Sequence, residues 1–403
     1  MKRIIFHVDV NSAFLSWEAC YRIHTLGETE DLREIPSAVG GDVSKRHGII
    51  LAKSIPSKKY GIQTGEPVVS ALRKCPQLKL VPPNYALYNH SSEAVMRMMS
   101  QYTDTVEQYS VDEAFMDMTG CCGDRDPAAV ADDLRCRIRD ELGFTVNVGI
   151  SSNKLLAKMA GDFEKPDKTH TLWPEEIPEK MWPLPVGDMF FVGRATQAKL
   201  ARLGVTTIGE LAGMDREILY AHFKSHGYTI HDFANGIDNS GFEIDEGPNK
   251  GYGNSLTTPA DVTDIDLAKQ YLLELSEIVA ARLREDGVKV STVTVHTRNT
   301  DLEFANHQMQ LKNPTDLTRE IYEAACICLE HMWQGEPLRQ LGVRTSKVEE
   351  ETSRQMSLFD DVDYEKNKAA ETAMDELRER FGKDIVTRAS LMGKKVRWNR
   401  EEK

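Results

Sequence analysis

The 403-residue sequence contains no run of 18 apolar residues, the length that a membrane-spanning helix needs. Its seven cysteines form no CxxC pair, so a zinc site is not supported and we expect reduced thiols in a cytoplasmic protein. It also lacks an excess of basic residues, since 50 lysines and arginines stand against 63 acidic residues and give a net charge of −13. This balance excludes a histone-like polycation. It does not exclude nucleic acid binding, because contacts with phosphates are local.

The apolar pattern predicts two α+β units joined by a helical segment. The first unit has strands expected at 4–10, 78–81, 106–118 and 144–150, and helices at 85–102, 130–142 and 153–163. Its β–α–ββ–α–β order is typical of a ferredoxin-like fold with a long insertion after the first strand. Prolines mark the entry to a helical segment at about 186–236, a βαββαβ unit follows at 251–350, and one more helix is expected around 366–381.

Three carboxylates are expected at one end of the first sheet. Asp9 ends the first strand, and Asp112 and Glu113 lie at the bend between two strands that neighbour it in this fold. Like charges that close repel each other, and a divalent cation relieves the repulsion. Mg²⁺ prefers hard oxygen ligands, and two such ions can flank an in-line phosphoryl transfer. Spacing alone leaves a second interpretation open, in which the carboxylates are strand ends that face solvent.

Three segments resemble the signatures of bacterial Y-family translesion DNA polymerases, of the DinB and UmuC kind. They are HVDVNSAF at 7–14, YSVDEAF at 109–115 and GISSNKLLAKMA at 149–160. The resemblance runs in order over about residues 1–350. It implies an α+β right-hand polymerase with a ferredoxin-like palm, small inserted fingers, a helical thumb with a helix-hairpin-helix element, and a βαββαβ little finger. The expected segments are a palm at 1–10 and 75–166, fingers at 11–74, a thumb at 167–240, a linker at 241–250, a little finger at 251–350 and a C-terminal tail at 351–403.

The resemblance also implies the residues of a polymerase active site. Asp9, Asp112 and Glu113 would hold two Mg²⁺ ions, with the carbonyl of Val10 as a further ligand. Phe14 would be a steric gate, because an aromatic ring under the sugar leaves no room for a 2′-hydroxyl. From its pattern alone, Phe14 could equally be an ordinary core aromatic residue.

The expected triphosphate contacts depart from the family pattern. Lys58 and Lys165 match basic positions of the family, but Ile55 stands where the family has a tyrosine. An isoleucine cannot hydrogen-bond a phosphate, and Lys58 supplies a point charge without the fork of an arginine. Lys53 or Lys59 could substitute. A solvated basic face is the other interpretation of this lysine cluster.

Contacts with primer–template DNA are expected in the thumb and the little finger. Gly193 fits the first glycine of a helix-hairpin-helix turn, whose backbone N–H groups bind phosphate, and Ala195 replaces the second. In the little finger, polar positions on two strands could line a DNA groove or form a solvated sheet face. These positions are Thr292, Thr294, His296, Arg298, Arg344 and Ser346.

The tail contains a peptide that resembles a ligand of the bacterial sliding clamp (its β subunit). Its residues are Gln355, Met356, Ser357, Leu358 and Phe359. Apolar side chains in a polar tail favour a partner pocket, unless they pack back onto the body. Accessory proteins of the SOS response are further possible partners that the resemblance suggests.

The sequence therefore predicts an error-prone, DNA-templated DNA polymerase that extends a primer with dNTPs past damaged template bases, without proofreading. Two alternatives stay open. One is a catalytically impaired DNA-binding scaffold recruited to the clamp, against which the retention of all three carboxylates speaks. The other is a nucleotidyl cyclase, which would need neither a hairpin nor a second βαββαβ unit. The net charge of −13 further predicts weak, salt-sensitive DNA binding that clamp tethering rescues.

Overall fold

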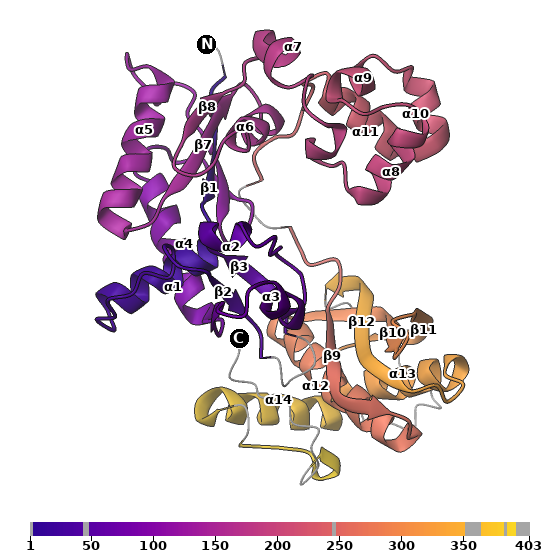
Figure 1. Ribbon diagram of the computed structural model, residues 1–403. Helices are drawn as coiled ribbons and strands as arrows, with labels where there is room; N and C mark the ends of the chain where they lie inside the picture. Colours follow the sequence, from indigo (N-terminus) through magenta and orange to yellow (C-terminus); the bar gives the residue numbers. More distant parts are fainter. Residues whose placement is uncertain (1–2, 43–47, 244–246, 351–363, 383–384, 392–403) are drawn as a thin grey trace. The chain divides into compact units, whose positions relative to one another are not determined.

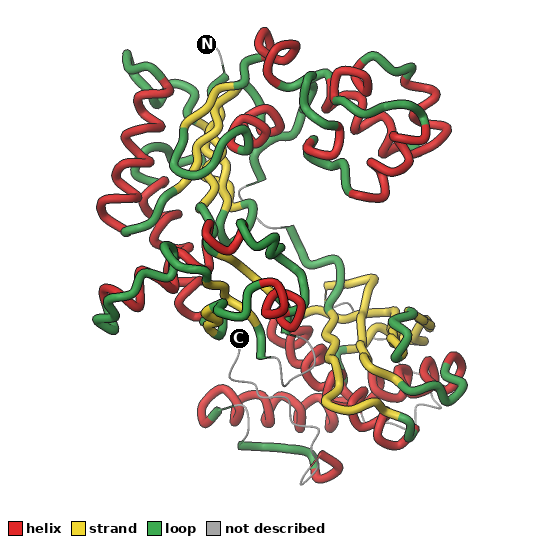
Figure 2. Tube along the Cα trace, in the orientation of Figure 1, coloured by secondary structure: helices red, strands yellow, loops and turns green. Residues whose placement is uncertain are grey.

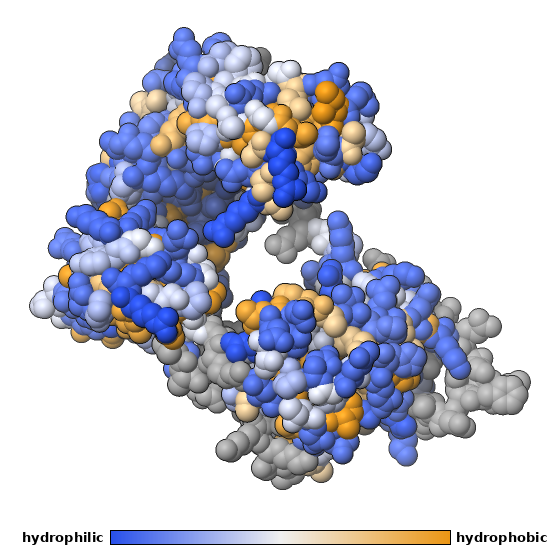
Figure 3. Space-filling model, turned by 45° about the vertical axis from the view of Figure 1, so that its right-hand side comes forward, coloured by the Kyte–Doolittle hydropathy of each residue, from blue (hydrophilic) through white to orange (hydrophobic). Residues whose placement is uncertain are grey.

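A computed structural model describes residues 3–42, 48–243, 247–350, 364–382 and 385–391. The chain forms two compact units that divide after residue 246. We describe each unit by itself. Within the described ranges, no helix is long and apolar enough to cross a membrane, and hydrophilic residues dominate the face drawn in Figure 3.

The first unit is built on a five-stranded sheet in the order β5-β6-β1-β7-β8 (Figure 1). Its strands are β1 (Ile5–Val10), β5 (Val106–Gln108), β6 (Glu113–Asp117), β7 (Val146–Ser151) and β8 (Thr169–Thr171). The central strand β1 is antiparallel to β6 and to β7. This arrangement confirms the predicted ferredoxin-like order, with β8 added at the edge in parallel to β7.

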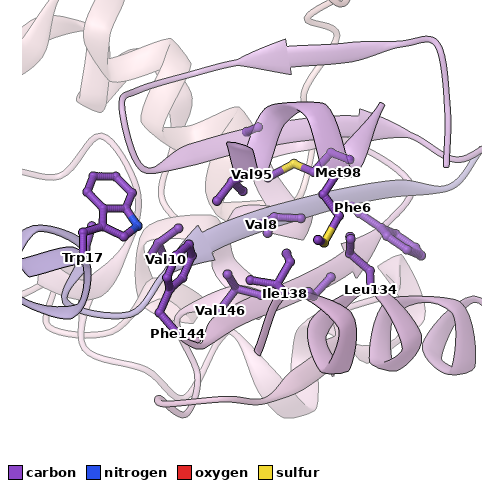
Figure 4. Packing of buried hydrophobic residues seen from close by; sticks show 14 of the residues in the cluster. Phe6, Val8, Val10, Trp17, Val95, Met98, Leu134, Ile138, Phe144 and Val146 are labelled. Atoms are coloured by element: carbon purple, nitrogen blue, oxygen red, sulfur yellow. The ribbon is translucent and has the colours of Figure 1, made fainter. Parts of the chain in front are cut away.

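Successive side chains of β1 point to opposite faces of the sheet. One face contributes to the hydrophobic core, and the other carries the candidate site residues. Phe6, Val8 and Val10 point to the face that is covered by helices α4 (Tyr85–Met99) and α5 (Pro127–Arg137), and Figure 4 shows them packed among side chains of both helices. A π-helical turn (Ile138–Leu142) extends α5. Burial of each such apolar side chain contributes roughly 1.5–3 kcal/mol, so this face fixes the register of β1.

The opposite face of β1 carries His7 and Asp9 and packs on helix α6 (Lys154–Gly161). Gly149 of β7 allows the close approach of this helix, because a Cβ there would lie 1.9 Å from the carbonyl oxygen of Ala157. The side chains of α6 are thereby brought onto the carboxylate-bearing strand ends.

A second, three-stranded sheet has the order β3-β2-β4. Its strands are β2 (Ser37–Gly40), β3 (Ile50–Lys53) and β4 (Lys79–Val81), and helices α2 (Ile55–Lys58) and α3 (Val68–Lys74) lie in the same segment. The strand expected near 78–81 pairs in parallel with β2, so this small sheet extends beyond the expected fingers segment 11–74. By contrast, helix α1 (Ala13–His24) buries Leu15 and Trp17 in the main core. The domain boundaries themselves stay predictions.

The segment after β8 consists of short helices joined by loops (Figure 2). The elements are η3 (Pro174–Glu176), α7 (Ile177–Lys180), η4 (Val186–Asp188), α8 (Arg194–Arg202), α9 (Ile208–Ala212), α10 (Arg216–Phe223) and α11 (Ser225–Ala234). Thr207 and Glu210 form a reciprocal capping box that starts α9. The apolar core of this segment is continuous with Leu155 and Met159 of α6, so the helical segment is attached directly to the helix behind the site.

The second unit confirms the predicted βαββαβ order. Its elements are β9 (Gly253–Val262), α12 (Ile265–Glu285), β10 (Val288–Asn299), β11 (Phe304–Thr315), α13 (Thr318–Met332) and β12 (Leu338–Glu350). The sheet order is β11-β10-β12-β9, and α12 and α13 cover one face of the sheet. Helix α14 (Tyr364–Phe381) and the turn η5 (Ala389–Leu391) follow, where one tail helix was expected.

Candidate active site

The three acidic residues occupy neighbouring backbone positions at the ends of β1 and β6. Asp9 and Glu113 are directly opposite each other in the antiparallel pair of β1 and β6. The backbone N–H of Val10 donates to the carbonyl oxygen of Asp112 at 3.0 Å, which fixes the hairpin bend beside the strand end. Sheet register therefore places the three residues at one edge of the sheet.

One oxygen of each carboxylate is oriented by a neighbouring group. Ser110 Oγ donates to Asp112 Oδ1 at 2.7 Å, and it accepts from the backbone N–H of Glu113 at 3.1 Å. Lys165 Nζ pairs with Asp9 Oδ2 and also, at 2.8 Å, with Asp162 Oδ1. Within the described ranges, no partner contacts the second carboxylate oxygen of Asp9 or Asp112.

Glu113 is held by two donors on a single oxygen. His7 Nε2 lies 3.2 Å from Glu113 Oε2, and Lys158 Nζ pairs with the same oxygen. Burial raises the pKa of the Glu113 carboxyl, but the hydrogen bonds from His7 and Lys158 outweigh it and lower the pKa to about 2. Burial lowers the pKa of His7, so its ring is neutral at neutral pH and its Nε2–H tautomer donates to the carboxylate.

The charge of Asp9 is compensated mainly by Lys165. Burial raises the pKa of Asp9, and the ammonium of Lys165 offsets part of that rise. Burial opposes the charge of Lys165, but Asp9 and Asp162 outweigh it and raise the pKa of the lysine. The ammonium of Lys165 is therefore charged at neutral pH, and its charge opposes the effect of burial on Asp9.

The donor set is chemically suited to Mg²⁺, although the side chains are paired with cations. Carboxylate and carbonyl oxygens are the hard ligands that this ion prefers. Among the residues that the structure describes, no three histidine, cysteine or acidic side chains are grouped closely enough to hold a metal ion. Lysine ammonium groups stand beside Asp9 and Glu113 instead. The ligand assignment for Asp9, Val10, Asp112 and Glu113 stays a prediction.

A pocket of about 400 Å³ opens beside the carboxylates. It joins the end of β1, the start of α1, and the segment of β3 and α2. Its lining residues are Asp9, Val10, Ser12, Ala13, Phe14, Leu51, Ala52, Lys53, Lys58, Thr64 and Asp112. The pocket thus combines two of the acidic residues, the predicted gate and two lysines.

Phe14 is held rigidly in the wall of this pocket. Its ring stacks on Tyr88 with centroids 4.5 Å apart and planes 8° apart, and Tyr85 meets it edge-on at 6.5 Å. Phe14 therefore both packs against the core and faces the pocket, so the two sequence interpretations of this residue are compatible.

The structure distinguishes the lysines that the sequence left as alternatives by whether they line the pocket. Lys53 and Lys58 line the pocket, whereas Lys59 does not, and the side chain of Ile55 is 49% exposed outside it. Burial and the neighbouring charge of Lys58 lower the pKa of Lys53. Lys165 lies on Asp9 at the pocket edge.

The hairpin before α8 contains both positions that the sequence compares with the motif. Gly193 is the N-cap of α8, which agrees with a helix-hairpin-helix turn. Ala195, which replaces the second glycine of the motif, lies in the first turn of α8. The left-handed residue of the turn is Phe191, with φ of +73°. A phenylalanine there is strained by the contact of its Cβ with the backbone.

In the second unit, the expected polar positions share the sheet face opposite the helices. Thr294 is paired with Arg344, and Thr292 with Ser346, across β10 and β12. Arg344 is exposed and Thr292 is buried. His296 and Arg298 follow along β10, where Arg298 lies 4.6 Å from the ring of Phe304. The clamp-binding positions Gln355, Met356, Leu358 and Phe359 lie outside the described residues.

Sequence reasoning did not single out Ser110, His7, Lys158 or Thr64. Ser110 and His7 fall within the recognised motifs, and a serine two residues before an acidic residue is a turn signal that could have marked Ser110. The contact of Lys158 with Glu113 depends on how α6 packs on the sheet. No local sequence pattern predicts how this helix packs on the sheet.

Comparisons with known proteins agree with this architecture. Residues 8–162 match the impB/mucB/samB family, residues 249–358 match the C-terminal domain of that family, and residues 174–205 match the HHH motif of the IMS family. DNA polymerase IV of Clostridium acetobutylicum is 43% identical over 394 residues, which cover 98% of this chain and 99% of the relative. DNA polymerase IV of Acetivibrio thermocellus is 38% identical, with 97% and 98% covered.

Among solved structures, the Y-family DNA polymerase chimera Dbh-Dpo4(243-245)-Dbh is similar with a TM-score of 0.73 and 20% identity. The match covers 86% of this chain and 100% of the chimera. At this identity the likeness concerns the fold.

Proposed function

Because this chain belongs to the impB/mucB/samB family of Y-family DNA polymerases, we propose that it elongates DNA primers with the residues gathered beside Asp9. It is a DNA-directed DNA polymerase that performs translesion synthesis. The observation that carries this conclusion is the 43% identity over almost the whole length of a DNA polymerase IV. Asp9 and Asp112, which line a pocket, and Glu113, which is paired with Asp9 across the strands, provide the matching chemistry.

Polymerases of this family use divalent metal ions, and we propose two Mg²⁺ ions here. Asp9, Asp112, Glu113 and the carbonyl of Val10 would hold them, with the open carboxylate oxygens as donors. When bound, such ions lower the pKa of a hydroxyl nucleophile and neutralise charge on a leaving pyrophosphate. The protein itself contributes orientation: Ser110 fixes the Asp112 carboxylate, and His7 fixes that of Glu113.

The pocket is the proposed site of the incoming dNTP. Lys53 and Lys58 place two positive charges on its wall, which suits the triphosphate, and Lys53 takes the place of the hydroxyl that Ile55 lacks. Phe14 also lines this pocket, and its ring, stacked on Tyr88, would act as the gate that leaves no room for a 2′-hydroxyl. Lys165, paired with Asp9 at the pocket edge, is a third phosphate-binding candidate.

Primer–template DNA would be held by backbone contacts that carry no sequence information. The N-terminus of α8 after Gly193 offers N–H groups to a phosphate. In the second unit, Thr294, Arg298 and Arg344 are the polar side chains that could contact a strand, with Thr292 buried beneath them. We further propose that Gln355 to Phe359 bind the sliding clamp. A cytoplasmic location and accessory SOS proteins stay predictions.

Primer extension on a template with an abasic site, with Mg²⁺, tests the proposal. The parent protein should extend the primer past the lesion. Asp112→Ala, or removal of the metal with EDTA, should abolish extension. Absence of extension by the parent would refute the function, and extension by Asp112→Ala at the parent rate would refute the site. Neither alternative function, a scaffold or a cyclase, has an observation in its favour.

A further inference from the structure

Glu113 is held in a way that leaves one of its oxygens open. His7 and Lys158 both pair with Oε2, and no described residue forms a hydrogen bond or ion pair with Oε1. The side chain of Lys158 is only 12% exposed, so its ammonium group is fixed in place rather than solvated. Lys158 and His7 together therefore hold Oε2 and leave Oε1 as the oxygen without a hydrogen bond.

Two aromatic rings enclose the ammonium of Lys158. The ring of Tyr109, in the loop before Asp112, lies 5.2 Å from Lys158 Nζ, and the ring of Phe190 lies 5.4 Å from it. The two rings meet edge to face at 6.3 Å. A desolvated cation over aromatic faces is attracted to them, so the rings help to define where the ammonium lies.

Phe190 belongs to the helical segment that carries the hairpin. Its backbone N–H donates to Met159 Sδ at 3.4 Å, next to Lys158 on α6. Its ring stacks on Phe233 of α11, and Gly193, the N-cap of α8, follows three residues later. A displacement of the hairpin segment thus acts directly on the ring that contacts Lys158.

We propose that Lys158 is a positioning residue that links the hairpin segment, through Phe190, to the orientation of the Glu113 carboxylate. This inference rests on the proposed function, since it assigns Glu113 as a metal ligand. Lys158 does not touch the reacting atoms. It leaves Glu113 Oε1 free to coordinate a metal ion. Because Phe190 contacts Lys158, the orientation of the Glu113 carboxylate depends on the position of the hairpin segment, which would contact DNA.

A purely electrostatic role of Lys158 predicts the opposite effect on metal binding. If the lysine only neutralised Glu113, its removal would take away a competing cation and tighten the binding of a divalent metal. If it positions the carboxylate, its removal weakens binding, as loss of a hydrogen bond to a metal ligand does. The direction of the change therefore separates the two roles.

Helix α6 supplies a matched control one turn away. Lys154 pairs with Glu107, is 10% exposed, and has its ammonium 5.6 Å from the ring of Phe115 and 4.8 Å from that of Phe242. Like Lys158, it is paired with a glutamate and lies near two aromatic rings, but Glu107 is not a proposed metal ligand. Lys154→Met thus reproduces the structural loss of Lys158→Met without touching Glu113.

The test measures Mn²⁺ binding to the full-length protein with a dideoxy-terminated primer–template and a dNTP, from the electron paramagnetic resonance signal of free Mn²⁺. Lys158→Met should weaken binding about tenfold, whereas Lys158→Arg should restore it, because it keeps the cation and donors. Lys154→Met should bind Mn²⁺ like the parent. Unchanged or tighter binding by Lys158→Met, or equal weakening by Lys154→Met, would overturn the proposal.

The link to Phe190 is tested by combining substitutions. Phe190→Leu should weaken Mn²⁺ binding in the parent and have no further effect in Lys158→Met, because its action passes through that lysine. Phe223→Leu, which removes another thumb ring near a cation, Lys199, should leave binding unchanged. Additive losses would overturn the link. Failure of the parent to extend a primer would instead count against the proposed function, and the two failures are distinguishable.

Discussion

At the scale of single residues, Phe14 carries the clearest expectation for substrate choice. Its ring is stacked on Tyr88 and lines the pocket, so it cannot move aside for a 2′-hydroxyl without losing that packing. Phe14→Ala should raise the ratio of ribonucleotide to deoxyribonucleotide incorporation efficiency on the order of 100-fold. Single-turnover incorporation of rCTP and dCTP measures this ratio. Phe14→Tyr keeps the ring and should discriminate like the parent; a gate assignment fails if Phe14→Ala does so too.

Lys53 allows a similarly sharp test of the triphosphate contacts. It lines the pocket with Lys58, whereas Lys59 in the same basic cluster does not. Lys53→Met removes a charged phosphate contact and should raise the dissociation constant for dNTP on the order of tenfold. Lys59→Met removes the same charge from the chain and should change that constant little. Equal effects of the two substitutions in single-turnover titrations would show that only the general field of the cluster matters.

At the scale of elements, helix α14 is fastened to the second unit by a buried ionic network. Glu371, on α14, accepts from Arg284 of α12 at 2.5 Å and from the backbone N–H of Thr318, at the start of α13, at 3.0 Å. Arg388 also contacts Glu371, at 3.1 Å. The side chains of Arg284 and Glu371 are 8% and 6% exposed. One carboxylate thus joins the tail to both helices that cover the sheet.

Neutralising this carboxylate should therefore destabilise the second unit. Glu371→Gln leaves the buried charge of Arg284 less well compensated and should lower the free energy of unfolding by about 3 kcal/mol. Scanning calorimetry of the full-length protein should show a transition several degrees lower. Glu376→Gln removes the same charge from an exposed position of α14 and serves as the control. Identical melting profiles for the two variants would contradict a structural role for the network.

The elements that the sequence predicted well are those with local apolar periodicity. The order of strands and helices in both units follows from patterns such as Leu272, Leu275 and Val279 on one face of α12, all of which are buried. Strand β8 was missed because three polar residues, Thr169–Thr171, carry no periodicity. The parallel pairing of β2 with β4 was missed because it joins segments about forty residues apart, and pairing of that kind is not encoded locally.

The residues of the candidate site likewise fall into those that local motifs predict and those that depend on tertiary packing. Asp9, Asp112, Glu113 and Phe14 were predicted because they stand in contiguous motifs. The choice of Lys53 over Lys59, and the contact of Lys158 with Glu113, are set by how whole elements pack, so the sequence left the first open and did not suggest the second. Phe191 at a positive φ is a further case, since nothing local marks a phenylalanine for that conformation.

At the scale of the whole molecule, charge is distributed unevenly along the chain. Residues 1–74 contain 11 basic and 8 acidic residues, whereas residues 251–350 contain 10 basic and 16 acidic residues. The segment with the proposed triphosphate lysines is thus positive, and the proposed DNA contacts of the second unit would rest on a few placed groups against an acidic background. Binding that rests on few phosphate contacts is weak at physiological salt and needs a tether.

The proposed tether is the peptide from Gln355 to Phe359. Linking the polymerase to a clamp that encircles DNA raises its effective concentration there, and such a link can increase overall avidity by about 10²–10⁴-fold without a new DNA contact. Changing Leu358 and Phe359 together to alanine should therefore abolish clamp-stimulated primer extension, with the clamp-free rate as internal reference, and Ser357→Ala should retain the stimulation. Raising the salt from about 50 to 200 mM should suppress clamp-free extension far more than clamp-assisted extension by the parent. Tight binding of primer–template by the parent without clamp at the higher salt would contradict this prediction. It would show that the net negative charge does not limit the affinity for DNA, and that the clamp peptide is not needed for retention on DNA.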